Sequence, residues 1–148
     1  MDIRVLGSLE VIDGGVPVEL SSRRLRRLLA VLVVHANEVV SADRLVDLVW
    51  GDSEPLGGAR TLKTNVSRLR SILEPSRLHG ESNRVVTRPP GYQLTLAADE
   101  LDAGRFDRLV GAAGRLVAEG DAVGAVARLD EALGLWRGHA LAEFVDED

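Results

Sequence analysis

The N-terminal part of the chain consists of short apolar runs separated by turn residues. Ile3–Leu6, Leu9–Ile12 and Val16–Leu20 have the length of strands, and Asp13-Gly14-Gly15 is typical of a tight turn. Pro17 lacks a backbone donor and favours an edge position. The pattern predicts a small antiparallel β-meander.

A helical period follows the strands. We expect three helices: one from Ser21 or Ser22 to about His35, one from Ser41 to Trp50, and one from about Ala59 to Leu73. Apolar residues recur three or four positions apart, which predicts one buried stripe on each helix. These stripes are Leu25, Leu28, Leu29, Leu32 and Val33 on the first helix, Leu45, Leu48 and Val49 on the second, and Leu62, Val66, Leu69 and Leu73 on the third.

Strands and then longer helices complete the pattern. Arg84–Arg88 and Tyr92–Leu96 predict a β-hairpin around Pro89-Pro90-Gly91, with Arg84 and Arg88 near its turn. Helices are expected over Ala103–Ala118 and Asp121–Arg137. Because only Glu119-Gly120 separates them, they must form an antiparallel helical hairpin.

Charge is distributed unevenly over the 148 residues, although the net charge is −5. Residues 1–98 contain 13 Arg and Lys against 11 Asp and Glu, whereas residues 99–148 contain 5 against 12. The segment from Leu56 to Leu73 has four basic residues and no acidic one. A local cationic surface, rather than the overall charge, indicates nucleic-acid binding.

The third helix carries its cations opposite its leucines. With about 100° per residue from Leu62, one side of the helix holds Arg60, Lys63, Thr64, Ser67, Arg68 and Ser71. Guanidinium groups suit guanine edges, and hydroxyl groups suit phosphates. A solvated face usually mixes Glu with Lys, and this face has no acid. The helix therefore favours contact with a DNA major groove.

The first helix leaves two interpretations open. Arg23, Arg24, Arg26 and Arg27 crowd its N-terminal turns, where the helix dipole disfavours cations by some tenths of a kcal/mol each. These arginines form either a solvated face or a contact with an anionic partner.

The composition argues against several function classes. The chain has no cysteine, and its longest apolar stretch, Leu28–Val34, is far shorter than the ~20 residues of a membrane helix. His35, His79 and His139 are isolated in sequence and make no metal-binding motif. Gly57-Gly58 lacks the Lys-Ser/Thr of a phosphate-binding loop. We therefore expect that the chain is not an enzyme, that it binds no cofactor or metal, and that it does not associate with a membrane. An N-terminus without a secretion signal indicates a cytoplasmic protein.

Three segments make the sequence recognisable, each matching in order. They are Val39-Val40-Ser41 through Leu48-Val49-Trp50-Gly51, Arg60 through Arg70, and Thr87-Arg88-Pro89-Pro90-Gly91-Tyr92-Gln93-Leu94. The chain resembles OmpR/PhoB-type winged-helix regulators and, more narrowly, the SARP/AfsR-type transcriptional activators. Phe106-Asp107, Gly120-Asp121 and Ala132 through Gly138 resemble the start of that family's bacterial transcriptional activation domain.

This resemblance implies an α+β fold. It would be a winged helix–turn–helix with an N-terminal antiparallel β-sheet and a C-terminal β-hairpin wing, followed by an all-α, TPR-like helical hairpin. Residues 1–98 would form the DNA-binding domain. Residues 99–148 would form the first helix pair of an incomplete activation domain, because relatives stack about three such pairs.

The resemblance also implies the partners. The chain would bind double-stranded promoter DNA, as a homodimer of side-by-side protomers on direct repeats, and recruit RNA polymerase through the loop Gly51–Gly58 and the C-terminal helices. The expected DNA-binding residues are Arg60, Thr61, Lys63, Thr64, Asn65, Ser67, Arg68, Arg70, Arg84 and Arg88. The competing hypothesis is a protein–protein interaction module on a winged-helix scaffold without DNA binding. Such a module would not need a helix face without acidic residues.

Overall fold

The computed structural model describes residues 1–51, 57–76 and 83–145. The chain forms two compact units. One unit comprises Val18–Leu96, and the other combines Met1–Pro17 with Ala97–Asp148. The architecture is mixed α+β, as predicted, with two small antiparallel sheets.

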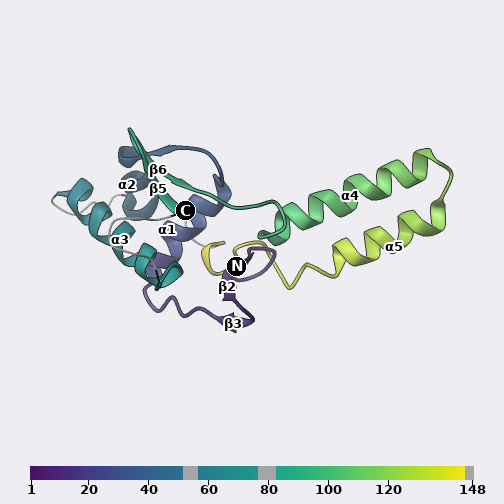
Figure 1. Ribbon diagram of the computed structural model, residues 1–148, viewed down its shortest axis with the longest axis horizontal. Coiled ribbons are helices and arrows are strands. Elements are labelled where there is room, and N and C mark those ends of the chain that lie inside the picture. The colour runs from purple at the N-terminus through teal and green to yellow at the C-terminus, as the bar shows by residue number, and fades with distance from the viewer. Residues whose placement is uncertain (52–56, 77–82, 146–148) are drawn as a thin grey trace. The chain divides into compact units, whose positions relative to one another are not determined.

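Three helices and a three-stranded sheet make up the Val18–Leu96 unit. Its elements are α1 (Arg23–Val34), β4 (Val40–Ser41), α2 (Ala42–Trp50), α3 (Gly58–Leu73), β5 (Val85–Arg88) and β6 (Gly91–Leu94) (Figure 1). The strand order is β4-β6-β5, and β5 and β6 form the predicted hairpin. Helix, helix, recognition-like helix and hairpin therefore follow one another as in a winged helix.

The predicted caps and stripes account for the helices of this unit. The Oγ atom of Ser22 accepts from the backbone N–H of Leu25, and that of Ser41 from the N–H of Arg44. All five predicted stripe residues of α1 and all four of α3 are buried. On α2 the prediction holds for Leu45 and Val49 but is wrong for Leu48, which is 37% exposed. Helix α2 instead buries Val46 and Trp50 beside Leu45 and Val49, so its buried stripe lies on the side of Val46 and Trp50 and leaves Leu48 out.

The sequence did not predict β4 as a strand. Its two residues pair with β6, where Val40 is opposite Tyr92 and Ser41 is opposite Gly91. A Cβ atom at Gly91 would collide with the carbonyl oxygen of Val40, so this pairing requires glycine. The short strand joins the start of α2 to the wing.

The other unit joins the N-terminal strands to the C-terminal helices. It contains β1 (Asp2–Arg4), β2 (Glu10–Asp13), β3 (Val16–Pro17), α4 (Asp102–Ala118), α5 (Ala122–Leu133) and the 3-10 helix η2 (Ala142–Phe144). The backbone N–H of Ile3 donates to the backbone carbonyl of Glu100 at 2.7 Å, and Ile3 forms an isolated parallel β-bridge with Leu101. Residues 1–17, which we expected beside the DNA-binding helices, thus belong to the same compact unit as α4 and α5. The domain division at residue 98 stays a prediction.

A buried carboxylate holds the turn between β1 and β2. Asp102 is 1% exposed and accepts hydrogen bonds from the backbone N–H groups of Val5 (2.9 Å), Leu6 (3.0 Å) and Ala103 (2.8 Å). The carboxylate of Glu143 accepts from the N–H of Leu9. Both acids satisfy backbone donors that the short strands leave unpaired.

Helix α5 ends at Leu133, earlier than the predicted Arg137. The backbone N–H of Arg137 donates to the carbonyl of Leu6 at 2.7 Å, and its guanidinium lies 2.7 Å from a carboxylate oxygen of Glu10. After Leu133 the chain thus bonds to the β1–β2 turn and to β2 rather than continuing the helix.

The α4–α5 pair is the predicted antiparallel hairpin, visible in Figure 1. Its three fully buried alanines are Ala113, Ala125 and Ala132. Several large apolar residues of α4, of α5 and of the segment after α5 are exposed, because one helix pair buries only one stripe on each helix. They are Val110 (41%), Val117 (64%), Val126 (57%), Leu129 (39%), Leu133 (64%) and Trp136 (42%).

Candidate nucleic-acid interface

The outward face of α3 is the cationic surface from which the sequence predicted DNA contact. Leu62, Val66 and Leu69 are at most 1% exposed and fix the orientation of the helix. Opposite them, five predicted DNA-binding residues are exposed: Arg60, Lys63, Thr64, Ser67 and Arg68. Burial of the leucine side therefore determines which side chains face outward.

The charges on this face are uncompensated within the described part of the chain. The side chains of Arg60, Lys63 and Arg68 make no hydrogen bond or ion pair with another described residue. The Thr64 hydroxyl donates to the carbonyl of Arg60 at 3.2 Å, one turn earlier. Three free cations on one helix face raise the local positive potential, which attracts a polyanion.

Thr61 and Asn65 are less accessible than predicted for groove contacts. Asn65 is only 9% exposed, and its Nδ2 atom donates to the carbonyl of Thr61 at 2.8 Å. Thr61 is half-buried. The two residues lie one turn apart at the side of the cationic face, where they stay candidates for DNA contact.

An open hollow of about 430 Å³ lies along this side of α3, and we call it the arginine hollow. It joins the side of α3 to the N-terminal end of α1. The sequence left open whether the α1 arginines contact an anionic partner, and it did not place Ser22 or Arg24 beside α3, because helices distant in sequence meet here only through packing. The lining residues are Ser22, Arg24, Arg60, Thr61, Thr64, Asn65 and Arg68.

Arg70 lies between α3 and the wing. Its Nε atom donates to the carbonyl of Val85 at 2.7 Å, and its Nη2 atom donates to the Thr87 hydroxyl at 2.8 Å. Its guanidinium carbon is 5.8 Å from the centre of the Tyr92 ring, a cation–π distance. Arg70 therefore holds the hairpin against α3, and its predicted role in DNA contact remains a prediction.

The two predicted wing arginines lie at opposite ends of the hairpin. Arg88 is exposed beside the turn Pro89-Pro90, as expected. Arg84 precedes β5, and its carbonyl accepts from the N–H of Thr95 at 2.8 Å. Its expected position near the turn is wrong, because Arg84 precedes Arg88 by four steps along an extended strand, which span about 13 Å.

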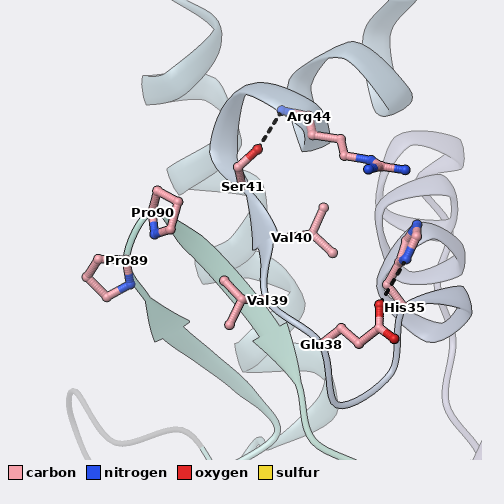
Figure 2. A pocket seen from close by; sticks show the side chains of 8 residues that line it. All are labelled: His35, Glu38, Val39, Val40, Ser41, Arg44, Pro89 and Pro90. Atoms are coloured by element: carbon pink, nitrogen blue, oxygen red, sulfur yellow. Dashed lines mark hydrogen bonds and ion pairs between the residues drawn. The ribbon is translucent and has the colours of Figure 1, made fainter.

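A second hollow, of about 400 Å³, lies beside the wing turn (Figure 2). It combines apolar Val39, Val40, Pro89 and Pro90 with polar His35, Glu38, Ser41 and Arg44. His35 lies 3.6 Å from the Glu38 carboxylate, and the Arg44 side chain is exposed. Because Glu38 is among its lining residues and half of the lining is apolar, this hollow lacks the uniform charge of the arginine hollow.

The loop Gly51–Gly58, expected to face RNA polymerase, falls mostly on residues 52–56, which lie outside the described residues. Of the helices in the described ranges, none combines the length and the apolar character that a membrane span requires.

Family comparison assigns both parts of the chain. Residues 15–94 match the model described as "Transcriptional regulatory protein, C terminal", and residues 101–148 match the "Bacterial transcriptional activator domain". The protein named transcriptional regulatory protein MoaR1 from Mycobacterium tuberculosis is 34% identical over 144 residues, covering 97% of this chain and 46% of its own length. The chain thus spans about half or less of the length of such curated relatives.

Solved structures of transcriptional regulators also resemble this chain. Mycobacterium tuberculosis EmbR, solved with a low-affinity phosphopeptide, superposes with a TM-score of 0.90 at 31% identity, covering 98% of this chain and 38% of that one. The DNA-binding domain of E. coli CadC has a TM-score of 0.51 at 28% identity, covering 60% of this chain and 79% of that one. The EmbR superposition extends over both parts of the chain.

Proposed function

The chain belongs to the family of transcriptional regulatory proteins whose C-terminal domain its residues 15–94 match, and from this premise we propose that it binds promoter DNA in a sequence-specific manner and activates transcription. One observation carries the proposal: the outward face of α3 presents exposed cations that no described residue neutralises. An α-helix with such a face fits the major groove, which is about 12 Å wide. A protein-interaction module would have no need for a face without carboxylates.

Roles within the site follow from position. Arg60 and Arg68 are two turns apart on α3 and are proposed to read base edges, whereas Lys63 contacts a phosphate. Arg88, exposed at the wing turn, would reach the neighbouring minor groove or backbone. Thr61, Thr64, Asn65 and Ser67 would add polar contacts along the same helix.

The test begins with selection of the preferred DNA sequence by the purified chain, followed by binding measurements on the selected duplex. Arg60→Ala and Arg68→Ala should each weaken binding by about 1–3 kcal/mol and relax the base preference. Lys63→Ala should weaken binding to all sequences alike and reduce the salt slope by about one. Arg108→Ala, which removes one exposed charge from α4, is the matched control. A wild-type chain without sequence preference would refute the proposal.

We further propose that protomers bind direct repeats side by side and recruit RNA polymerase in the bacterial cytoplasm. The match of residues 101–148 to an activator domain supports this part. Transcription in vitro from a promoter carrying the selected repeat should rise with added protein. Tight DNA binding with no rise in transcript would exclude recruitment while leaving DNA recognition intact.

Residues 99–148 are proposed to be the first helix pair of the activation domain. The apolar surface supports this: Val110 and Val117 are seven residues apart on α4, as are Val126 and Leu133 on α5, so each pair shares a helix face that stays exposed. A Leu133→Glu variant should bind less of an apolar dye than the wild type without losing stability. A large drop in stability would show that this face is already covered in the chain.

A further inference from the structure

We propose that Arg24, at the start of α1, binds a DNA backbone phosphate and extends the interface beyond α3. This inference rests on the DNA-binding function proposed above and names a contact that sequence alone left undecided. It starts from the arginine hollow, in which Arg24 and Ser22 face the same space as Arg60 and Arg68.

The charges that line the hollow have one sign. Arg24, Arg60 and Arg68 contribute guanidinium groups, the other lining residues are neutral, and no carboxylate takes part. Arg24 is exposed, and its side chain makes no hydrogen bond or ion pair with a described residue. Three like charges around one open space repel each other unless an anion enters.

Neighbouring arginines of α1 are in a different situation. Arg27 donates from Nε to the carbonyl of Leu48 at 2.9 Å, so its side chain is held against α2. Arg23 and Arg26 also have partners. The four arginines that look equivalent in the sequence therefore differ, and Arg24 is the one that lines the hollow.

Helix geometry indicates a phosphate rather than a base as the partner of Arg24. Residues 60, 64 and 68 form one row on α3, about 12 Å long at 1.5 Å per residue. A helix about 10–12 Å in diameter fills the major groove, about 12 Å wide, so base edges are reached from that helix itself. Helix α1 packs against α3, and packed helices are about 8–10 Å apart. A side chain on α1 therefore reaches the strand that borders the groove.

The consequence for binding is electrostatic and independent of sequence. One phosphate contact makes the negative slope of log K against log salt steeper by about 0.9. If binding of the variant and of the wild type is equal at 1 M salt, loss of the contact therefore weakens binding about fivefold at 0.15 M salt. Arg24→Ala should lower the affinity for the selected duplex and for a scrambled duplex by this same factor. Arg24→Lys should retain the slope.

The experiment measures binding of wild type, Arg24→Ala, Arg24→Lys, Arg60→Ala and the control Arg108→Ala over a salt series. Duplexes with a neutral methylphosphonate at single positions then locate the contact. One methylphosphonate should weaken the wild type but have no added effect on Arg24→Ala. Circular dichroism confirms that the exposed substitution leaves the fold intact.

The two levels of the argument fail in different ways. If wild type binds DNA and Arg60→Ala relaxes its preference, but Arg24→Ala keeps the full salt slope and methylphosphonate pattern, Arg24 is a solvated side chain and this inference is wrong. If wild type shows no preference for any duplex, the proposed function itself is wrong.

Discussion

The buried carboxylate of Asp102 offers a test of how the N-terminal strands are held to α4. Replacing Asp102 with alanine removes the acceptor for the N–H groups of Val5 and Leu6, both in the buried part of the unit. Leaving a buried donor without a partner costs about 1–3 kcal/mol. The two donors together predict a loss of about 2–6 kcal/mol in the free energy of unfolding. The third donor, Ala103, lies in the first helical turn, where it is easier to hydrate.

The matched control is Asp121→Ala. Asp121 is exposed and accepts one hydrogen bond, from the N–H of Gly124 at 2.8 Å, as the N-cap of α5. Loss of an N-cap typically costs about 1 kcal/mol. Both variants remove the same chemical group, so their difference isolates the effect of burial and of the number of donors.

The assay is urea unfolding followed by the fluorescence of Trp136. The chain has two tryptophans, and a Trp50→Phe background leaves Trp136 as the reporter of the unit that contains Asp102. The Trp136 ring packs edge-to-face against Phe106 with 5.7 Å between centroids, so its emission should change on unfolding. If Asp102→Ala costs no more than Asp121→Ala, the carboxylate does not hold the N-terminal turn.

Three further outcomes follow from single residues. Arg70→Ala removes the bonds to Val85 and Thr87 and should destabilise the chain by about 1–3 kcal/mol, with faster amide hydrogen exchange in β5; unchanged exchange would contradict its role in holding the wing. Leu69→Ala, at a site with 0% exposure, should cost about 2–5 kcal/mol in thermal or urea unfolding, and a cost under 1 kcal/mol would show that α3 is not anchored there. Burial of Asp2 acts to raise the pKa of its carboxyl, but hydrogen bonds and charges from two arginines outweigh burial and lower that pKa from its ordinary value. The ionised Asp2 carboxylate therefore stabilises the folded chain above its unfolded-state pKa of about 3.9. This contribution to the free energy of unfolding is lost as pH falls through the lower folded-state pKa. Asp2→Asn should be less stable than wild type at neutral pH, with a difference that shrinks below about pH 3.9; a difference independent of pH would contradict this assignment.

The three helices and the hairpin of the Val18–Leu96 unit could be predicted because local signals agree there. Ser22 and Ser41 cap their helices, and the leucine spacing of α1 and α3 matches a single buried side. The same kind of spacing wrongly predicted that Leu48 is buried, and it placed the end of α5 at Arg137 instead of Leu133. A periodic pattern measures only the tendency to form a helix, whereas Arg137 is bonded to the distant turn at Leu6 and to Glu10 of β2 and not within a helix.

In the candidate site, too, the sequence predicts some features and only packing decides others. The cationic face of α3 follows from residue spacing, since burial of one side determines the other. The different situations of Arg70, held by the wing, and Arg24, lining the hollow, could not be read from their identity or spacing. Both depend on which helix or strand packs alongside.

The amino-acid sequence alone determined helices α1 to α5, the β5–β6 hairpin and the acid-free face of α3, because caps, turns and apolar periodicity act over a few neighbouring residues. Only the tertiary structure decided that residues 1–17 join α4 and α5, that Arg84 lies far from the wing turn, and that α1 contributes to the hollow. These outcomes depend on pairing between segments distant in sequence. Packing between these segments decides which backbone donors and which cationic side chains have partners. A pattern of neighbouring residues does not predict this.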